Sequence, residues 1–184
     1  MQASITSLLR CPNCGCTRLK ADAFTGSTGG DIREGAVICP RCRSWYPIED
    51  YVLEFLPTAL AYREDRKKFW QKHKMRLKGL AVTPKASRQS LVPQRTQQQY
   101  FDWYADNERQ AYTRYAGSPF WQATDAHIFG AWEQGIRPGM RLLDVGCAQG
   151  RSTFRFAKHP IDIVGFDIAK TMVQQAAKRY RSGK

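Results

Sequence analysis

Two C-x-x-C pairs constrain the fold of this 184-residue chain more than any other feature. Cys11 and Cys14 form the first pair, and Cys39 and Cys42 form the second, with 24 residues between them. A two-residue spacer lets both thiolates of a pair face the same ion, and the second pair completes a tetrahedral site. Four protein ligands leave no open coordination position, so the pattern predicts a structural zinc ion. Such an ion stabilises a domain whose core is too small to fold unaided.

Other roles for the cysteines stay open at this point. Each C-x-x-C pair could be a redox dithiol, although that motif is typical of a strand-helix-strand context and one copy is enough. Cys16 could replace Cys14 as a ligand, which would give a four-residue spacer after Cys11. Cys147 lies much further along the chain and is interpreted as an ordinary buried thiol.

The cysteine pattern also bears on the compartment. Paired C-x-x-C motifs indicate metal binding before disulfides, and therefore a reducing environment. Residues 1–10 contain no apolar core of a signal peptide. No apolar run approaches the roughly 20 residues that span a bilayer. We therefore expect a cytoplasmic protein that has no membrane partner.

The stretch after the second pair carries a resemblance to a known family. Residues 45–50 read WYPIED and residues 52–57 read VLEFLP. This stretch resembles the zinc-ribbon family that activates tRNA and protein-release-factor methyltransferases, in which a Tyr-Pro-Ile-x-Asp-Gly-Ile-Pro run stands here. Tyr51 replaces the glycine of that run, so we expect a different turn. The resemblance covers about residues 8–57 and implies a small β-rich ribbon, fused here ahead of an enzyme.

A loop of small residues between Asp144 and Gly150 is the second strong motif. An apolar strand is predicted over residues 140–145 and a helix over residues 152–158. Small residues let the backbone approach a ligand closely, and the loop N–H groups with the helix dipole favour a negative group. The dinucleotide fingerprint G-x-G-x-x-G fails, because Ala148 and Arg151 occupy its second and third glycine positions.

The loop resembles instead the D/E-x-G-x-G-x-G loop of class I S-adenosylmethionine-dependent methyltransferases. Asp144, Gly146 and Gly150 match, and Ala148 replaces the middle glycine, which is tolerable if its φ is negative. A second buried-type strand, predicted over residues 161–166, ends at Asp167, 17 residues after Gly150. A carboxylate at that place can accept both ribose hydroxyls of a nucleoside.

The resemblance implies a role for each matching residue. Asp167 would bind the ribose, Ile168 would pack against the adenine, and Met172 matches a usual hydrophobic position of the next helix, predicted over residues 171–180. The cofactor-binding set implied for S-adenosyl-L-methionine is Asp144, Gly146, Cys147, Ala148, Gly150, Asp167 and Ile168. Another nucleotide, or an ordinary tight turn without a ligand, are the alternatives.

The predicted fold class is α/β, with a small β-rich zinc ribbon followed by the first β-α-β-α units of a Rossmann-like methyltransferase domain. Such a domain has about seven strands, and a two-stranded parallel sheet cannot cover its own faces. We therefore expect the chain to be a fragment of a longer methyltransferase, inactive by itself. No catalytic residue can be named, and His127 is more typical of a structural histidine than of a base. The methyl acceptor is undetermined, with RNA or a small molecule as candidates.

The excess of positive charge is local. Of a net charge of +13, a net +9 falls in residues 57–100. Residues 58–79 predict a basic helix with a thin apolar stripe, and residues 63–78 are a candidate nucleic-acid contact. The alternative is a solvated helix in a linker.

We predict a zinc-ribbon domain over 1–57, a basic helix and linker over 58–97, and an aromatic helical lid with the methyltransferase part over 98–184. A binding module for RNA or protein, with a degenerate or incomplete cofactor domain, is the alternative function.

Overall fold

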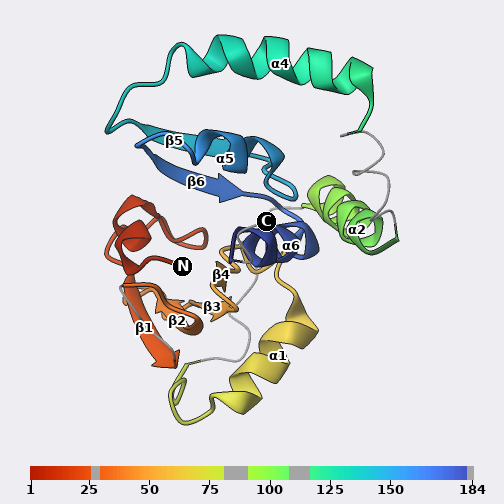
Figure 1. Cartoon of the computed structure of the whole chain (residues 1–184). Helices are drawn as coiled ribbons and strands as arrows, with labels where there is room; N and C mark the ends of the chain where they lie inside the picture. Colours follow the sequence, from red (N-terminus) through yellow and green to blue (C-terminus); the bar gives the residue numbers. More distant parts are fainter. Residues whose placement is uncertain (26–29, 81–90, 108–116, 182–184) are drawn as a thin grey trace. The chain divides into compact units, whose positions relative to one another are not determined.

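The computed structural model describes residues 1–25, 30–80, 91–107 and 117–181. The chain forms two compact units, Met1–Arg95 and Thr96–Lys184. The first contains antiparallel strands and the second combines helices with parallel strands, which confirms the predicted α/β class (Figure 1). Among the described residues, no helix is both long enough and apolar enough to cross a membrane.

The first unit is built on a four-stranded antiparallel sheet. Its strands are β1 (Lys20–Thr25), β2 (Glu34–Ile38), β3 (Trp45–Glu49) and β4 (Val52–Leu53), in the spatial order β1-β2-β3-β4. A short 3-10 helix, η1 (Ala3–Leu8), precedes them. Because side chains alternate along a strand, Val37 and its partner Tyr46 face one side of the sheet, whereas Ala36 and Trp45 face the other.

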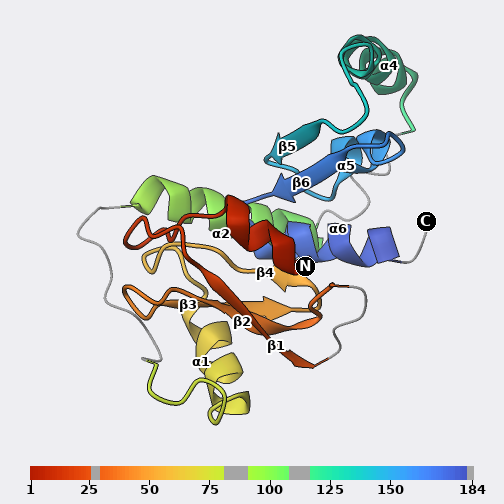
Figure 2. The ribbon, with the colours of Figure 1, turned by 90° about the vertical axis from the view of Figure 1, so that its left-hand side faces the viewer.

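Both faces of this sheet are buried. One face carries Tyr46 and Ile48 in a core that includes Cys11 and Cys39. The other face packs Trp45 against Phe69 of helix α1 (Arg63–Lys72) and against Leu77 of the turn that follows it. Figure 2 shows α1 and η1 on opposite sides of the sheet. Helix α1 therefore completes the hydrophobic core of the ribbon unit.

The turn between β3 and β4 keeps the backbone form that glycine would favour. Asp50 and Tyr51 form a two-residue loop between the paired residues Glu49 and Val52, with φ values of 47° and 71°. Two consecutive left-handed residues are the signature of a type I′ hairpin turn. Both loop residues are therefore left-handed, although neither is a glycine. The tyrosine adopts the left-handed conformation, and its N–H donates to the carbonyl of Arg33 at 2.9 Å.

The second unit contains the predicted strand-helix-strand-helix sequence. Strand β5 (Arg141–Val145) pairs in parallel with β6 (Asp162–Phe166), and the helices α5 (Arg151–Phe156) and α6 (Lys170–Arg181) follow them. The paired ends Val145 and Phe166 bring the carboxyl ends of the two strands together. Helices α2 (Val92–Asn107) and α4 (Pro119–Glu133) precede the strands and are rich in aromatic residues.

Three details differ from the sequence-based expectations. The basic helix is shorter than 58–79, and the predicted linker ends early because α2 begins at Val92, with Pro93 in the first turn, where proline is tolerated. The strands are not buried on both faces: Leu143, Val145 and Phe166 are 60%, 68% and 47% exposed. Residues 81–90 of the predicted linker and residues 108–116 of the predicted aromatic helical lid lie outside the described residues. The predicted domain boundaries at 57 and 97 stay predictions.

Candidate functional site

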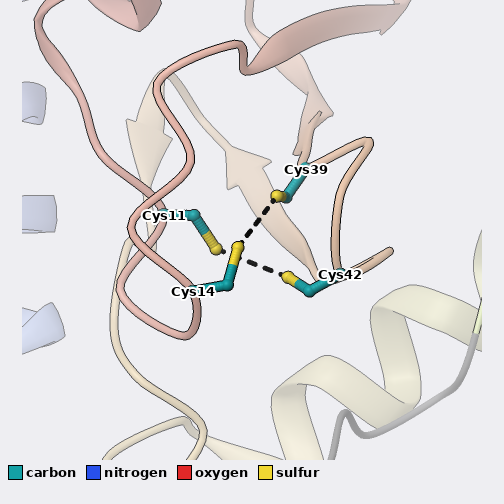
Figure 3. Close-up of side chains that lie close together, drawn as sticks. All are labelled: Cys11, Cys14, Cys39 and Cys42. Carbon is teal, nitrogen blue, oxygen red and sulfur yellow. Dashed lines mark hydrogen bonds between the residues drawn. The ribbon is translucent and has the colours of Figure 1, made fainter.

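Four cysteines meet at the end of the ribbon sheet (Figure 3). The Sγ atoms of Cys11, Cys14, Cys39 and Cys42 all lie within 4.8 Å of one another. Cys11 and Cys42 are 3.5 Å apart, and Cys14 and Cys39 are 3.6 Å apart. Thiolates bound tetrahedrally at about 2.3 Å from zinc lie about 3.8 Å from each other. The spacing and the donor set of this cluster therefore fit a zinc ion.

The two C-x-x-C turns have the same backbone design. Gly15 N–H donates to Cys11 O at 2.8 Å, and Arg43 N–H donates to Cys39 O at 2.9 Å, with positive φ at both donors. Cys11 N–H bonds the carbonyl of Cys16, as Cys39 N–H bonds that of Ser44. Cys16 is thus the counterpart of Ser44, just beyond the turn. The structure assigns Cys14 to the cluster and leaves Cys16 outside it.

Hydroxyl groups surround the cluster. Tyr46 Oη lies 3.1 Å from Cys11 Sγ, and Ser44 Oγ lies 3.2 Å from Cys42 Sγ. Asn13 Nδ2 donates to Ser44 Oγ at 3.0 Å and holds it in place. Burial raises the pKa of Cys42, but hydrogen bonds with Ser44 and the neighbouring thiols outweigh it and bring the pKa to about 6. Outer hydrogen bonds of this kind orient ligands and stabilise their charge.

The second candidate site lies where β5 and β6 end. Asp167 faces the loop that follows β5: its Oδ2 accepts the Ala148 N–H at 3.0 Å, and its Oδ1 accepts the Ala169 N–H at 2.9 Å. Asp144 accepts hydrogen bonds from the hydroxyls of Ser152 and Thr153 in the first turn of α5. Both carboxylates predicted from sequence are therefore fixed at the same end of the sheet.

The loop backbone is more occupied than the sequence suggested. The N–H groups of Gly146 and Cys147 both donate to Phe166 O, at 2.9 and 3.0 Å, and Gly150 N–H donates to Cys147 O at 2.8 Å. With the Ala148 amide, four N–H groups of the loop are bonded within the protein. The expectation of exposed amides awaiting a negative group is wrong for these four.

The dihedral angles explain the glycines and expose a strained position. Gly146 and Gly150 have φ values of 75° and 83°, and a Cβ at Gly150 would also lie 2.6 Å from the ring of Phe154. Ala148 has a φ of 45°, so the negative φ that would make alanine comfortable there is not adopted. A left-handed alanine costs about 1 kcal/mol relative to glycine. The loop therefore keeps the backbone shape of the glycine motif, although the left-handed Ala148 destabilises it.

Helix α2 supports the segment after β6, which the sequence did not reveal. Gln98 Nε2 donates to Ile168 O at 3.2 Å, and Asp102 Oδ1 accepts the Thr171 N–H at 2.9 Å, so a side chain of α2 caps α6. Ala105 packs with Ala169 and Met172 in a small core. Gln98, Asp102 and Ala105 share one helix face. This stripe of small and polar residues on an aromatic helix is the sequence signal from which the contact could have been predicted.

Cys147 and His127 behave as ordinary residues. Burial raises the pKa of the Cys147 thiol to about 12, and the charges of Asp167 and Asp144 act in the same direction. The thiol is therefore uncharged at neutral pH, in keeping with its interpretation as a buried thiol. His127 is exposed on α4.

Comparisons with known proteins agree with both sites. Residues 4–50, which hold all four clustered cysteines, match the Trm112p-like protein family. Residues 136–184, which hold β5 to α6, match a methyltransferase domain family. No curated protein matches the chain. The two matches confirm the resemblances and their order, and α1, α2 and α4 lie outside both matched ranges.

Proposed function

We propose that this chain is the cofactor-binding part of an S-adenosylmethionine-dependent methyltransferase that carries a zinc ribbon. The observation that carries the proposal is the contact between the Ala148 N–H and the Asp167 carboxylate at 3.0 Å, because it joins the glycine loop of one strand to the acid of the next. Nucleosides bind at this carboxyl edge in open parallel sheets. The family match to residues 136–184 supports the methyl-transfer chemistry.

Each residue of the site has a proposed task. Asp167 already accepts one amide on each carboxylate oxygen, and each oxygen keeps a lone pair for a ribose hydroxyl. Ile168 follows it, with its carbonyl held by Gln98, and would pack against the adenine. Asp144 and the loop of Gly146, Cys147, Ala148 and Gly150 would hold the methionine end.

When bound, S-adenosylmethionine supplies a methyl group already activated by a positive sulfonium. The contribution of this chain is to bind and orient it, and the carboxylates of Asp144 and Asp167 place negative charge at the site of a cationic ligand. No catalytic residue is assigned. The acceptor, RNA or a small molecule, stays open.

Calorimetric titration of the chain with S-adenosylmethionine tests this function. Asp167→Asn should weaken binding at least about tenfold, because hydrogen bonds to a charged carboxylate are worth about 1.5–3 kcal/mol each. Asp162→Asn is the matched control, since Asp162 lies at the other end of the same strand and is exposed. Equal affinities for the two variants, or no binding by the parent chain, would refute the assignment.

We also propose that Cys11, Cys14, Cys39 and Cys42 hold a structural zinc ion. The ion would join two loops of a unit whose core is small, so its binding energy is folding energy. Elemental analysis should give one zinc per chain, lost in the double variant Cys39→Ser with Cys42→Ser. Cys16→Ser should keep the metal, because Cys16 lies outside the cluster. A zinc content unchanged by the double variant would contradict the site.

The second candidate function is a binding module with a degenerate cofactor domain. The left-handed Ala148 and the three loop amides that bond backbone carbonyls favour it. In that case the chain would bind zinc but not S-adenosylmethionine. The calorimetric titration separates the two candidates, because both of them bind zinc and only the methyltransferase binds S-adenosylmethionine. The cytoplasmic location stays a prediction.

A further inference from the structure

The N-terminal unit carries a group of exposed basic side chains, called here the basic face. Its members are exposed and come from α1, from the turn after it and from the second C-x-x-C turn. They are Arg41, Arg43, Arg63, Lys67, Lys68, Lys74, Arg76 and Lys78. The sequence suggested only residues 63–78. The fold adds Arg41 and Arg43 of the second C-x-x-C turn, called here the metal-binding knuckle.

The fold holds this surface in place. On the inward side of α1, Arg66 Nε donates to Glu54 Oε1 at 2.7 Å, and the two side chains are 1% and 4% exposed. Phe69 and Leu77 are buried against Trp45 on the sheet. The outward lysines are therefore mounted on a helix that is part of the ribbon core, unlike those of a solvated linker helix.

One hydrogen bond connects the helix turn to the metal-binding knuckle. Arg43 Nη2 donates to Gly79 O at 2.7 Å, which places the turn carrying Lys78 beside the knuckle carrying Arg41. The positive groups of the two segments therefore form one surface. Metal binding at Cys39 and Cys42 would fix the knuckle side of it.

The cations of the basic face outnumber the two acids of α1 that lie among them, Glu64 and Asp65. Glu54 is taken by Arg66, and Glu34 pairs with Lys72 and His73. The six basic-face residues of α1 and its turn make no ion pair within the part of the chain that the structure describes. Fixed, unpaired cations of one sign attract a polyanion and lose their mutual repulsion when it binds.

We propose that the basic face binds a nucleic-acid strand through its phosphates. A membrane surface fits less well, because Met75 is the single exposed large apolar side chain described in residues 63–80 and no apolar stripe accompanies the charge. The basic face and the cofactor loop belong to different units, so nucleic-acid binding does not rest on methyl transfer. It holds or fails whether or not the chain binds S-adenosylmethionine.

The salt dependence of binding can be worked from the charges. Each neutralised phosphate contributes about −0.7 to the slope of log K against log salt for single strands and about −0.9 for duplexes. The six basic-face cations of α1 and its turn therefore predict a slope of about −4 to −5. Raising the salt from 50 to 200 mM should then weaken binding by about 10²- to 10³-fold.

Fluorescence anisotropy of the zinc-loaded full chain with a 16-nucleotide RNA of mixed sequence tests the proposal, with a DNA of the same sequence as a parallel probe. The first variant replaces Lys67, Lys68, Lys74 and Lys78 by Gln. The matched control replaces Arg10, Arg18, Lys20 and Lys178, which are exposed elsewhere, so both variants lose four charges. Circular dichroism and zinc content check that both variants fold.

In the basic-face variant, the slope of log K against log salt should become less steep by about 3, and the affinity at 100 mM salt should fall at least about tenfold. The control should keep both values close to those of the parent. Equal losses in the two variants would mean that only net charge matters and would overturn the proposal. So would a flat salt response, or binding to vesicles with 30% phosphatidylserine that exceeds binding to both nucleic acids.

Discussion

The buried pair between Arg66 and Glu54 gives the sharpest stability prediction. Arg66→Met removes the guanidinium and leaves the Glu54 carboxylate, only 4% exposed, without its cation. Removing one partner of a buried ion pair costs about 3–5 kcal/mol. The guanidinium also lies 5.6 Å from the centre of the Tyr46 ring, and losing that cation–π contact adds about 0.5–2 kcal/mol to the loss.

The double variant distinguishes the loss of the ion pair itself from the cost of leaving one buried charge without a partner. Replacing Glu54 by Leu together with Arg66→Met leaves no uncompensated charge, and apolar pairs of similar volume are often neutral or stabilising. We therefore expect the double variant to recover most of the loss. Arg63→Met is the matched control, because Arg63 is exposed one turn earlier on the same helix.

Hydrogen–deuterium exchange of α1 peptides in the zinc-loaded chain measures these changes. A loss of 3–5 kcal/mol corresponds to exchange about 10²- to several 10³-fold faster for Arg66→Met. Arg63→Met should exchange at the parental rate and the double variant close to it. An Arg66→Met variant with parental exchange, or a double variant worse than the single one, would refute the argument that this pair anchors α1 to the sheet.

Three further predictions concern single positions. Tyr51→Gly should raise the free energy of unfolding of the N-terminal unit by about 1 kcal/mol, because φ at this position is 71°, and a lower thermal midpoint would contradict this. Hydrogen bonds from Lys158 and Arg155 lower the pKa of Glu133 to about 2, so its stabilisation is present above about pH 4.5 and is lost as the pH falls toward 2; Glu133→Gln should remove this part of the acid sensitivity in thermal unfolding. Asp102→Ala should weaken S-adenosylmethionine binding less than Asp167→Asn does, by loosening the start of α6, whereas Asp106→Ala on the same helix should leave it unchanged.

The sequence predicted the elements whose signal is local. The runs around β5 and β6 are apolar, bounded by a glycine loop and an acid, and the structure places both strands within a residue or two of the prediction. The spacing of the two C-x-x-C pairs predicted a metal cluster, because both thiolates of such a pair can face one ion, whereas the choice of Cys14 over Cys16 needed the fold.

What sequence reasoning missed depends on contacts between distant segments. Arg66 reads as one more surface charge in a basic run, and only the fold brings Glu54 to it across 12 positions. Gln98 meets Ile168 70 positions away, so no local pattern could connect them. Ala148 shows a second kind of failure: hydrogen bonds on both sides hold the loop in the glycine form against the preference of its side chain.

Ultraviolet cross-linking with methyl-labelled S-adenosylmethionine tests the central claim most directly, because it reports where the cofactor lies. Trypsin cuts the chain after Arg141, Arg151, Lys158 and Lys170, so the loop and the Asp167 segment fall in separate peptides, 142–151 and 159–170. Cofactor binding at this site predicts label in one or both of these peptides, displaced by unlabelled S-adenosylhomocysteine. Label confined to other peptides, or label that the competitor does not displace, would contradict it.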